Sequence, residues 1–243
     1  MEIADILKRF GAGLAEEVVV PHRTYNIPPS SYVWVVYQDE KGKRKLRQMV
    51  WDLRKSWTKE KEEGAKTPPP KGKDKKPKKG PLSNLTATTA LKTPFFKSIL
   101  ETTRCLVVVD GFNEWKGKLP FRFVRRNGDQ LGLGGVYRTK VLPDGKKEYY
   151  AAVMTTFPNA LIRQVHTRQP IILPPEQEGL WLNPGSKLKN FEDYLGPSSP
   201  SELEYYPVSK EINKTYIKVD GKYKAIDSPE LILPVGKVVA LAA

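Results

Sequence analysis

The fold of this chain is decided by Thr103–Trp115, which reads Thr-Arg-Cys-Leu-Val-Val-Val-Asp-Gly-Phe-Asn-Glu-Trp. Its β-branched run, Val107 to Val109, predicts a short strand that is buried on both faces. The turn dipeptide Asp110-Gly111 ends that strand. Glu114 follows directly, so a buried strand delivers an acid beside an indole. A lone glutamate here also fits a solvated loop, and the choice between these interpretations depends on the rest of the chain.

A second segment, Val165–Leu173, places a histidine and an arginine at the mouth of another apolar run. The chain contains only two histidines, which makes His166 stand out. Histidine titrates near neutral pH and suits proton transfer. The planar guanidinium of Arg168 is suited to holding a phosphate. The alternative for His166 is a hydrogen-bonded surface residue without a chemical role.

Together these segments resemble the SOS response-associated peptidase (SRAP) family, whose members shield abasic sites in single-stranded DNA. Five motifs carry the resemblance in the family's order: Tyr25–Pro29, Trp51–Trp57, Asn84–Thr89, Arg104–Trp115 and His166–Leu173. Two of them depart from the family pattern. Gln169 stands where the family has a methionine, and Asn84–Thr89 is an eroded copy of Asn-Ala-Arg-Ala-Glu-Thr, with Thr86 for the arginine and Thr88 for the glutamate.

The resemblance implies roles for individual residues. It assigns the catalytic positions to Glu114, His166 and Asn84, where the acid and the histidine would assist proton movements at the abasic sugar. It also implies that Asn84 and Arg168 hold the DNA. We therefore expect an acid–base pair at the site.

The family's nucleophile has no counterpart in the printed chain. In the family a cysteine follows the initiator methionine, and its amine and thiol trap the aldehyde of the abasic site as a stable ring. Position 2 here is Glu2, and the one cysteine, Cys105, falls in the predicted strand. We expect Cys105 to be a small buried residue rather than a reactive thiol. No cysteine-based crosslink is expected from this chain, although a start codon farther upstream would restore one.

Charge and aromatic content favour nucleic acid as the partner. The 41 lysines and arginines against 27 acidic residues give a net charge of +14. Such an excess attracts polyanions, although a generally basic proteome or a solubility effect would also produce it. Base stacking on aromatic side chains is the complementary contact, with core packing as the alternative for each ring. The candidate DNA-contacting residues are Arg104, Arg168, Trp51, Trp57, Phe112, Lys71, Lys73, Lys75 and Lys76.

The chain is predicted to be α+β, a single SRAP-like domain over residues 1–243. It is expected to be mainly antiparallel β, in a barrel-like sheet with flanking helices. Residues 58–81, rich in lysine, proline and glycine, are predicted to form a mobile basic loop that either tracks phosphates or is a solvated insertion. Predicted helices lie at 1–10, 93–103, 158–165, 174–182 and 187–195. Predicted strands lie at 31–37, 46–53, 119–125, 130–137, 148–155, 204–208, 215–219 and 237–240.

Other features narrow the class of protein. No apolar run approaches the roughly 18 residues that a spanning helix needs, and the N-terminus lacks the apolar core of a signal peptide. We expect an intracellular protein of cytoplasm or nucleoid, not secreted, without a membrane partner. No cofactor and no metal site is predicted, and the oligomeric state stays open.

Three classes of function remain. The first is a module that binds single-stranded or abasic DNA without covalent capture. The second is an enzyme with abasic-site lyase or thiol-independent peptidase-like activity, using Glu114 and His166. The third is a scaffold recruited for structure or protein interaction, for example in a virus or mobile element.

Overall fold

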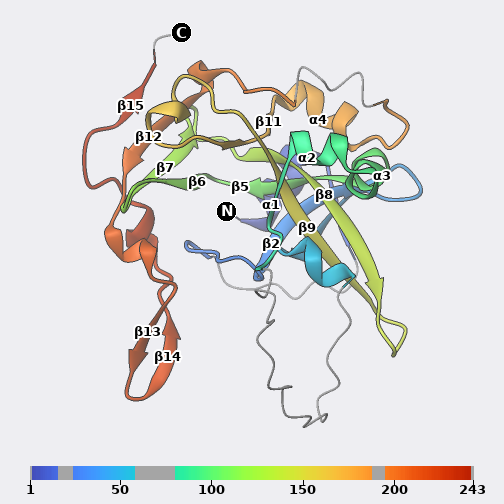
Figure 1. Cartoon of the computed structure of the whole chain (residues 1–243), viewed down its shortest axis with the longest axis horizontal. Coiled ribbons are helices and arrows are strands. Elements are labelled where there is room, and N and C mark those ends of the chain that lie inside the picture. The colour runs from blue at the N-terminus through green and yellow to red at the C-terminus, as the bar shows by residue number, and fades with distance from the viewer. Residues whose placement is uncertain (1, 16–23, 58–79, 188–194, 242–243) are drawn as a thin grey trace, which may run out of the picture.

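The computed structural model describes residues 2–15, 24–57, 80–187 and 195–241. Strands predominate in these segments, and the helices lie around them (Figure 1). The prediction of an α+β fold with a barrel-like sheet is confirmed. No helix in the described part of the chain is both long and apolar enough to cross a membrane.

The main sheet closes on itself. Its strands follow the order β3-β2-β5-β8-β9, and a further pairing of Val50 on β3 with Tyr150 on β9 completes the ring. The neighbours along β3-β2-β5-β8-β9 are antiparallel, in line with the prediction of a mainly antiparallel sheet. The barrel strands are β2 (Tyr32–Gln38), β3 (Arg44–Val50), β5 (Arg104–Val109), β8 (Leu131–Val141) and β9 (Lys147–Thr156).

Four short strands extend this sheet: β1 (Gly13–Leu14), β4 (Asn84–Thr86), β10 (Gln169–Pro170) and β11 (Ile172–Leu173). Both β4 and β10 pair with the end of β9, where Thr155 is the partner of Thr86 and of Pro170. The segments on either side of Thr155 carry two of the motifs found in the sequence. Strand pairing therefore brings the Asn84 and the His166 motifs to one end of the barrel.

A second sheet follows the order β15-β12-β7-β6. Its strands are β6 (Phe112–Lys116), β7 (Leu119–Arg125), β12 (Leu203–Pro207) and β15 (Val239–Ala240). The chain passes from the barrel into this sheet at Asp110-Gly111, between β5 and β6. A side chain at Gly111 would place a Cβ 2.7 Å from the carbonyl oxygen of Phe123, so this crossing requires glycine.

Strand β5 is buried on both faces, as predicted. Cys105 and Val107 belong to one buried cluster, and Leu106 and Val108 to the other. Cys105 itself is 0% exposed, which confirms the expectation of a buried thiol. Alternation along a strand sends successive side chains to opposite faces, so β5 forms part of both the interior and the outer core of the barrel.

Three tyrosines identify the face that lines the barrel. Tyr37 on β2 lies 5.4 Å from Tyr137 on β8 and 6.3 Å from Tyr149 on β9, measured between ring centroids. These strands are not neighbours of β2 in the ring. The rings therefore meet across the inside, together with the cluster that contains Cys105 and Val107.

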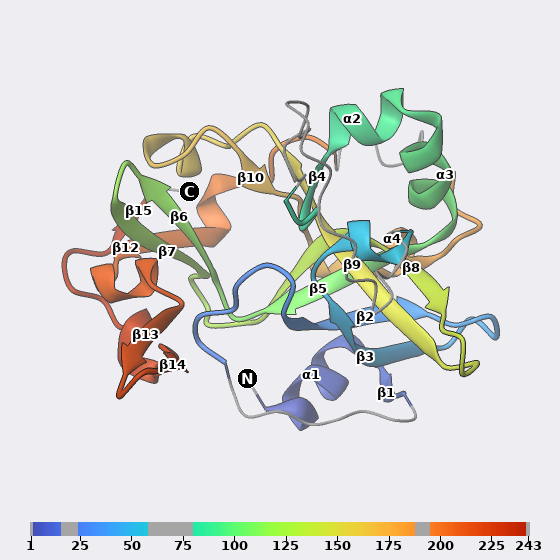
Figure 2. The same cartoon turned by 60° about the horizontal axis from the view of Figure 1, so that its bottom comes forward.

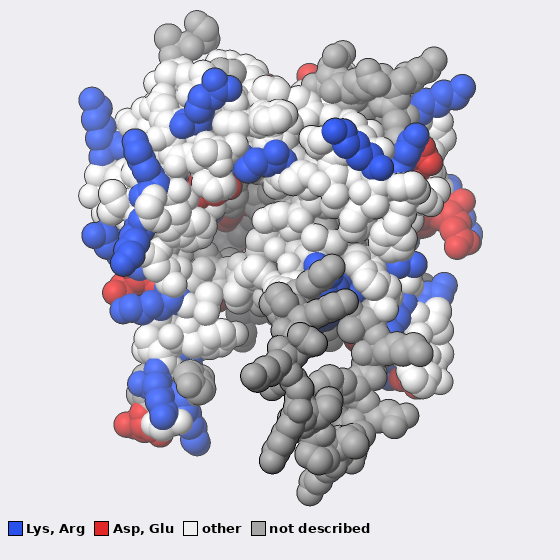
Figure 3. Space-filling model, viewed as in Figure 1, with Lys and Arg blue, Asp and Glu red and all other residues white. Residues whose placement is uncertain are grey.

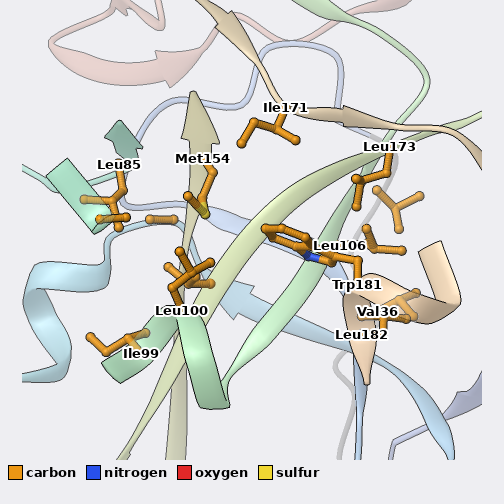
Figure 4. Close-up of a cluster of buried hydrophobic side chains, with 14 of the residues drawn as sticks. Val36, Leu85, Ile99, Leu100, Leu106, Met154, Ile171, Leu173, Trp181 and Leu182 are labelled. Carbon is orange, nitrogen blue, oxygen red and sulfur yellow. The ribbon is translucent and has the colours of Figure 1, made fainter. Parts of the chain in front are cut away.

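The outer face is covered by helices. Figure 4 shows Trp181 of α4 against Leu106, with Leu100 of α3 and Met154 of β9 in the same cluster. The Trp181 indole also donates a 2.9 Å hydrogen bond to the carbonyl of Cys105. The helices are α1 (Ile3–Phe10), α2 (Ala87–Lys92), α3 (Pro94–Thr102) and α4 (Pro175–Leu182).

Some local predictions differ from the structure. The predicted helix at 158–165 is only a short 3-10 turn, η2 (Ile162–Gln164), whose start the Asn159 side chain caps by accepting from the backbone N–H groups of Leu161 and Ile162. Strand β6 was not predicted, so Glu114 lies on a strand rather than in a loop. The predicted helix at 187–195 and the basic loop at 58–81 lie almost entirely outside the described residues.

Candidate functional site

The structure brings Glu114 and His166 together. Glu114 lies on β6, the edge strand of the second sheet, and His166 lies in the loop between β9 and β10 of the barrel. The Nδ1 atom of His166 is 3.2 Å from Oε2 of Glu114. The pair therefore joins the two sheets, and both members were singled out from the sequence.

Burial shifts the pKa of Glu114, the acid of this pair. The Glu114 side chain is 20% exposed and that of His166 is 37% exposed. Burial raises the pKa of Glu114 to about 7, an effect that the nearby His166 charge partly opposes. A carboxyl group with such a pKa both gives and takes a proton near neutral pH, which is the requirement for a general acid or base.

Backbone contacts orient the imidazole. Its Nδ1 atom lies 3.1 Å from the carbonyl oxygen of Arg168, and the Arg168 backbone N–H points to the same nitrogen at 3.3 Å. Nδ1 therefore faces both the Arg168 carbonyl and the Glu114 carboxyl when it carries a proton, and it accepts the Arg168 N–H when it does not. These contacts fix the ring plane toward Glu114.

The strand that carries Glu114 is held at both ends. Before it, Arg122 of β7 donates to Asp110 at 2.6 Å, and the Arg122 side chain is only 5% exposed. After it, the Trp115 indole donates to the side-chain oxygen of Asn213 at 2.6 Å. An edge strand fixed at its entry and exit holds the carboxyl in one position.

The loop that carries His166 is organised by Gln169, which the sequence marked only as a departure from the family motif. The side-chain oxygen of Gln169 accepts the backbone N–H of Asn159 at 2.6 Å, and its amide donates to Ser198 at 3.0 Å. Gln169 is 0% exposed. The available signal was the replacement of the family's methionine by an amide, a residue that when buried needs hydrogen-bond partners.

Thr155 anchors one nitrogen of the Arg168 guanidinium. Its Nη2 atom donates to the carbonyl of Thr155 at 2.7 Å and to the Thr155 hydroxyl at 3.0 Å. Its guanidinium lies 5.7 Å from the ring centroid of Phe157. Its Nε atom is buried and has no hydrogen-bond partner among the described residues. Because Nε is buried, Arg168 could reach a ligand beside His166 only through the tip of its half-buried guanidinium.

Asn84 lies on the neighbouring strand and is exposed. Its register partner on β9 is Val153, two residues before the threonine that anchors Arg168. Trp51 donates from its indole to the carbonyl of Ser83 at 2.8 Å and so holds the backbone next to Asn84. Thr86, which replaces the family's arginine, caps α2 through a bond from the Thr89 N–H at 3.2 Å.

Arg104 does not lie at this site. It is 3% exposed, and its guanidinium donates to the backbone carbonyls of Trp181, Leu100, Glu101, Asn183 and Ser186. Burial also lowers its pKa. Because the Arg104 guanidinium is hydrogen-bonded to carbonyls in the core, it cannot reach a phosphate. The expectation of a DNA contact at Arg104 is therefore corrected to a structural role.

The aromatic candidates separate into different environments. Phe112 is half-buried and stacks on Phe123, with ring centroids 5.3 Å apart. Trp57 is 37% exposed and meets the edge of Phe95 at 5.2 Å, in a cluster that lies against α3. Packing thus accounts for Phe112, whereas Trp57 keeps a free surface. Lys71, Lys73, Lys75 and Lys76 lie outside the described residues.

One face of the protein is hollowed and has basic side chains around the hollow. Figure 3 shows a hollow near the middle of this face with acidic atoms on its wall, and lysine and arginine side chains spread around it. Among the described residues, no group of three His, Cys, Asp or Glu side chains could hold a metal ion.

Comparison with known proteins gives a consistent result. The family model described as SOS response associated peptidase (SRAP) matches residues 1–215. The abasic site processing protein YoqW of Bacillus subtilis is 28% identical over 218 residues, covering 87% of this chain and 90% of its own length. The abasic site processing protein YedK of Escherichia coli is 26% identical over 163 residues, covering 65% of this chain and 69% of its own length.

Solved structures share the fold. A crystal structure of a Bordetella bronchiseptica protein matches with a TM-score of 0.66 at 20% identity, covering 86% of this chain and 96% of that one. A protein from Bacteroides thetaiotaomicron matches with a TM-score of 0.64 at 17% identity, covering 85% of this chain and 82% of that one.

Proposed function

The chain belongs to the SRAP family, and from that premise we propose that it binds single-stranded DNA at abasic sites without capturing them through a thiol. The observation that carries the proposal is the contact of Glu114 with His166 at 3.2 Å, beside the half-buried Arg168. The names of its relatives, abasic site processing proteins, point to the same class of substrate.

The site offers the groups that an abasic sugar needs. A ring-opened abasic sugar carries an aldehyde, a hydroxyl and flanking phosphates. The acid–imidazole pair exchanges protons with the first two, and Arg168 supplies a cation for a phosphate. Asn84 is exposed on the adjoining strand and adds an amide that both donates and accepts.

Thiol capture has no candidate within the 243 residues. Their one cysteine is Cys105, which is 0% exposed inside the barrel. Burial raises the pKa of its thiol well above the usual range, so the thiolate that would attack an aldehyde is absent near neutral pH. Binding on this proposal is reversible and relies on hydrogen bonds, charge and stacking.

Fluorescence anisotropy with labelled oligonucleotides tests the proposal. We expect micromolar or tighter binding of single-stranded DNA at low salt, weakening steeply as salt rises, because phosphate contacts release counterions. An oligonucleotide with one abasic site should bind more tightly than its undamaged counterpart. Glu114→Gln and His166→Ala should remove that preference while leaving the binding of undamaged DNA in place. Affinity that is absent, or indifferent to salt, would count against DNA as the partner.

A second candidate is abasic-site lyase activity, favoured by the raised pKa of Glu114. An acid that ionises near pH 7 beside an imidazole can remove the proton next to the aldehyde, after which the 3′ phosphate leaves. Strand scission of an abasic oligonucleotide, followed on a denaturing gel with time, measures this directly. Scission by the wild type that is lost in Glu114→Gln would establish the activity, and scission equal to the protein-free rate would exclude it.

A further inference from the structure

A two-stranded hairpin projects from the body of the protein just past the family match. It comprises β13 (Tyr216–Val219) and β14 (Lys222–Ala225), whereas the family model ends at residue 215. Figures 1 and 2 both show it extending away from the two larger sheets. Each strand of four residues spans about 13 Å. The family match therefore does not account for this element.

The root of the hairpin is fixed. The Asn26 side chain donates to the carbonyl of Lys214 at 3.1 Å and to that of Ile226 at 3.5 Å, so that it joins the residues flanking the two strands. The backbone N–H groups of Tyr25 and Asn26 donate to the Asp227 carboxylate at 2.5 and 3.0 Å. The Tyr-Asn motif thus clamps the base of the hairpin, and an isolated hairpin, marginal in water, gains a rigid mount.

This mount connects to the wall that carries Glu114. The turn η5 (Lys210–Asn213) ends three residues before the hairpin begins. Asn213 accepts from the Trp115 indole at 2.6 Å and donates to the carbonyl of Lys118 at 3.1 Å. Trp115 is the immediate neighbour of Glu114 on β6. The position of the hairpin is therefore set relative to the strand that carries the catalytic acid.

The surface of the hairpin is basic. Lys218, Lys222 and Lys224 are all exposed, and Asp220 at the turn is the only acid between residues 216 and 225. The strand register places Lys222 and Lys224 on the opposite face from Lys218. Tyr216 is 55% exposed at the root and offers a ring to a passing base.

We propose that the β13–β14 hairpin is a phosphate-binding arm for the single strand that continues out of the Glu114–His166 site. This inference rests on the proposed function and extends it, because it assigns the flanking DNA to a defined surface. Three ammonium groups on a ribbon that is fixed at its root neutralise phosphates without reading sequence, which suits a protein that must bind wherever an abasic site occurs.

A charge-matched pair of variants tests the arm. In one, Lys218→Ala, Lys222→Ala and Lys224→Ala are combined. In the control, Lys41→Ala, Lys146→Ala and Lys147→Ala remove the same charge from exposed lysines on the other hairpins. Both should melt at the wild-type temperature, because every substituted side chain is exposed.

Binding is compared for abasic single strands of about four and about sixteen nucleotides across a salt series. For the longer strand, the arm variant should bind about tenfold more weakly than the wild type at low salt. The slope of log K against log salt concentration should become shallower by about 2, which is roughly 0.7 for each lost phosphate contact. For the shorter strand, used as a competitor, it should match the wild type. The control variant should match the wild type for both lengths.

Each other outcome has a distinct meaning. An arm variant that equals the control on the longer strand overturns the arm and leaves the proposed function standing. An equal loss of affinity for both strand lengths also overturns the phosphate-binding arm, because the substitutions would then act by changing the structure of the Glu114–His166 site. If the wild-type protein binds neither strand in a salt-dependent manner, the proposed function is wrong, and so is the proposal for the hairpin that rests on it.

Discussion

Two arginines that were both predicted to contact DNA lie in opposite environments. Arg104 opens β5 and is 3% exposed, with its guanidinium enclosed by backbone carbonyls of α3, α4 and the residues after α4. Arg168 follows β9 and is half-buried, with Nη2 bonded to Thr155 and a buried Nε that has no partner among the described residues. The first stabilises the packing of helices on the barrel, and the second lies beside His166. The difference shows that charge type does not identify a ligand contact, whereas the partners of each nitrogen do.

The largest expected effect is the loss of stability on replacing Arg104, the buried arginine. Arg104→Met should lower the free energy of unfolding by about 3–5 kcal/mol, because several buried carbonyls would lose a charged donor at once. Chemical denaturation monitored by circular dichroism measures this. The fraction that remains folded should bind DNA with wild-type affinity. A variant of normal stability with weakened binding would reverse the roles given to the two arginines.

The site arginine should show the opposite pattern. Arg168→Ala should weaken abasic DNA binding about tenfold, or about 1.4 kcal/mol, through loss of a charge-assisted contact. Its stability should change by less than about 1 kcal/mol, because only two hydrogen bonds to Thr155 are lost at a half-buried position. Arg168→Lys is the informative control: it keeps the charge and loses the planar fork, and intermediate affinity is expected. Wild-type affinity in Arg168→Ala would exclude the residue from the DNA surface.

A smaller effect distinguishes the acid from both arginines by its pH dependence. The Glu114 carboxyl has a usual pKa of 4.5 and a folded pKa of about 7, so between these values the folded protein holds more protons than the unfolded chain. The contribution of Glu114 to stability therefore falls as pH rises through this window. Thermal unfolding from pH 5 to pH 8 should show the wild type losing stability relative to Glu114→Gln. Parallel curves for the two proteins would show that burial does not shift this carboxyl.

The sequence predicted the parts of the site that depend on local pattern. The apolar run of β5 predicted a strand buried on both faces, and the motifs around Glu114 and His166 predicted two residues that lie in contact. The burial of Arg104 could not be predicted, because it depends on where α4 returns to the barrel, far along the chain. Strands β6 and β14 are short and mixed in polarity, so no alternating apolar pattern marked them. Gln169 stood out only as a departure from the family, and its role became clear from its contacts with Asn159 and Ser198.

The Thr86 and Thr88 replacements bear on the same comparison. Thr86 is the register partner of Thr155, whose carbonyl and hydroxyl hold Arg168. Arg168 is therefore a cation close to the strand on which the family has an additional arginine. This gives a physical reason to expect DNA binding that is weaker at the lesion and more dependent on contacts outside it, such as those proposed for the β13–β14 hairpin.

The central claim, that abasic DNA is held without a thiol bond, is tested most directly by a denaturing gel run without reductant. Protein is incubated with an abasic single strand whose binding has been verified on a native gel, and the mixture is heated in detergent before loading. We predict a shifted band on the native gel and none on the denaturing gel, with Cys105→Ala behaving as the wild type because that thiol is buried. A heat-stable band that persists in Cys105→Ala would show that another residue captures the sugar covalently, and the account of reversible binding would be wrong.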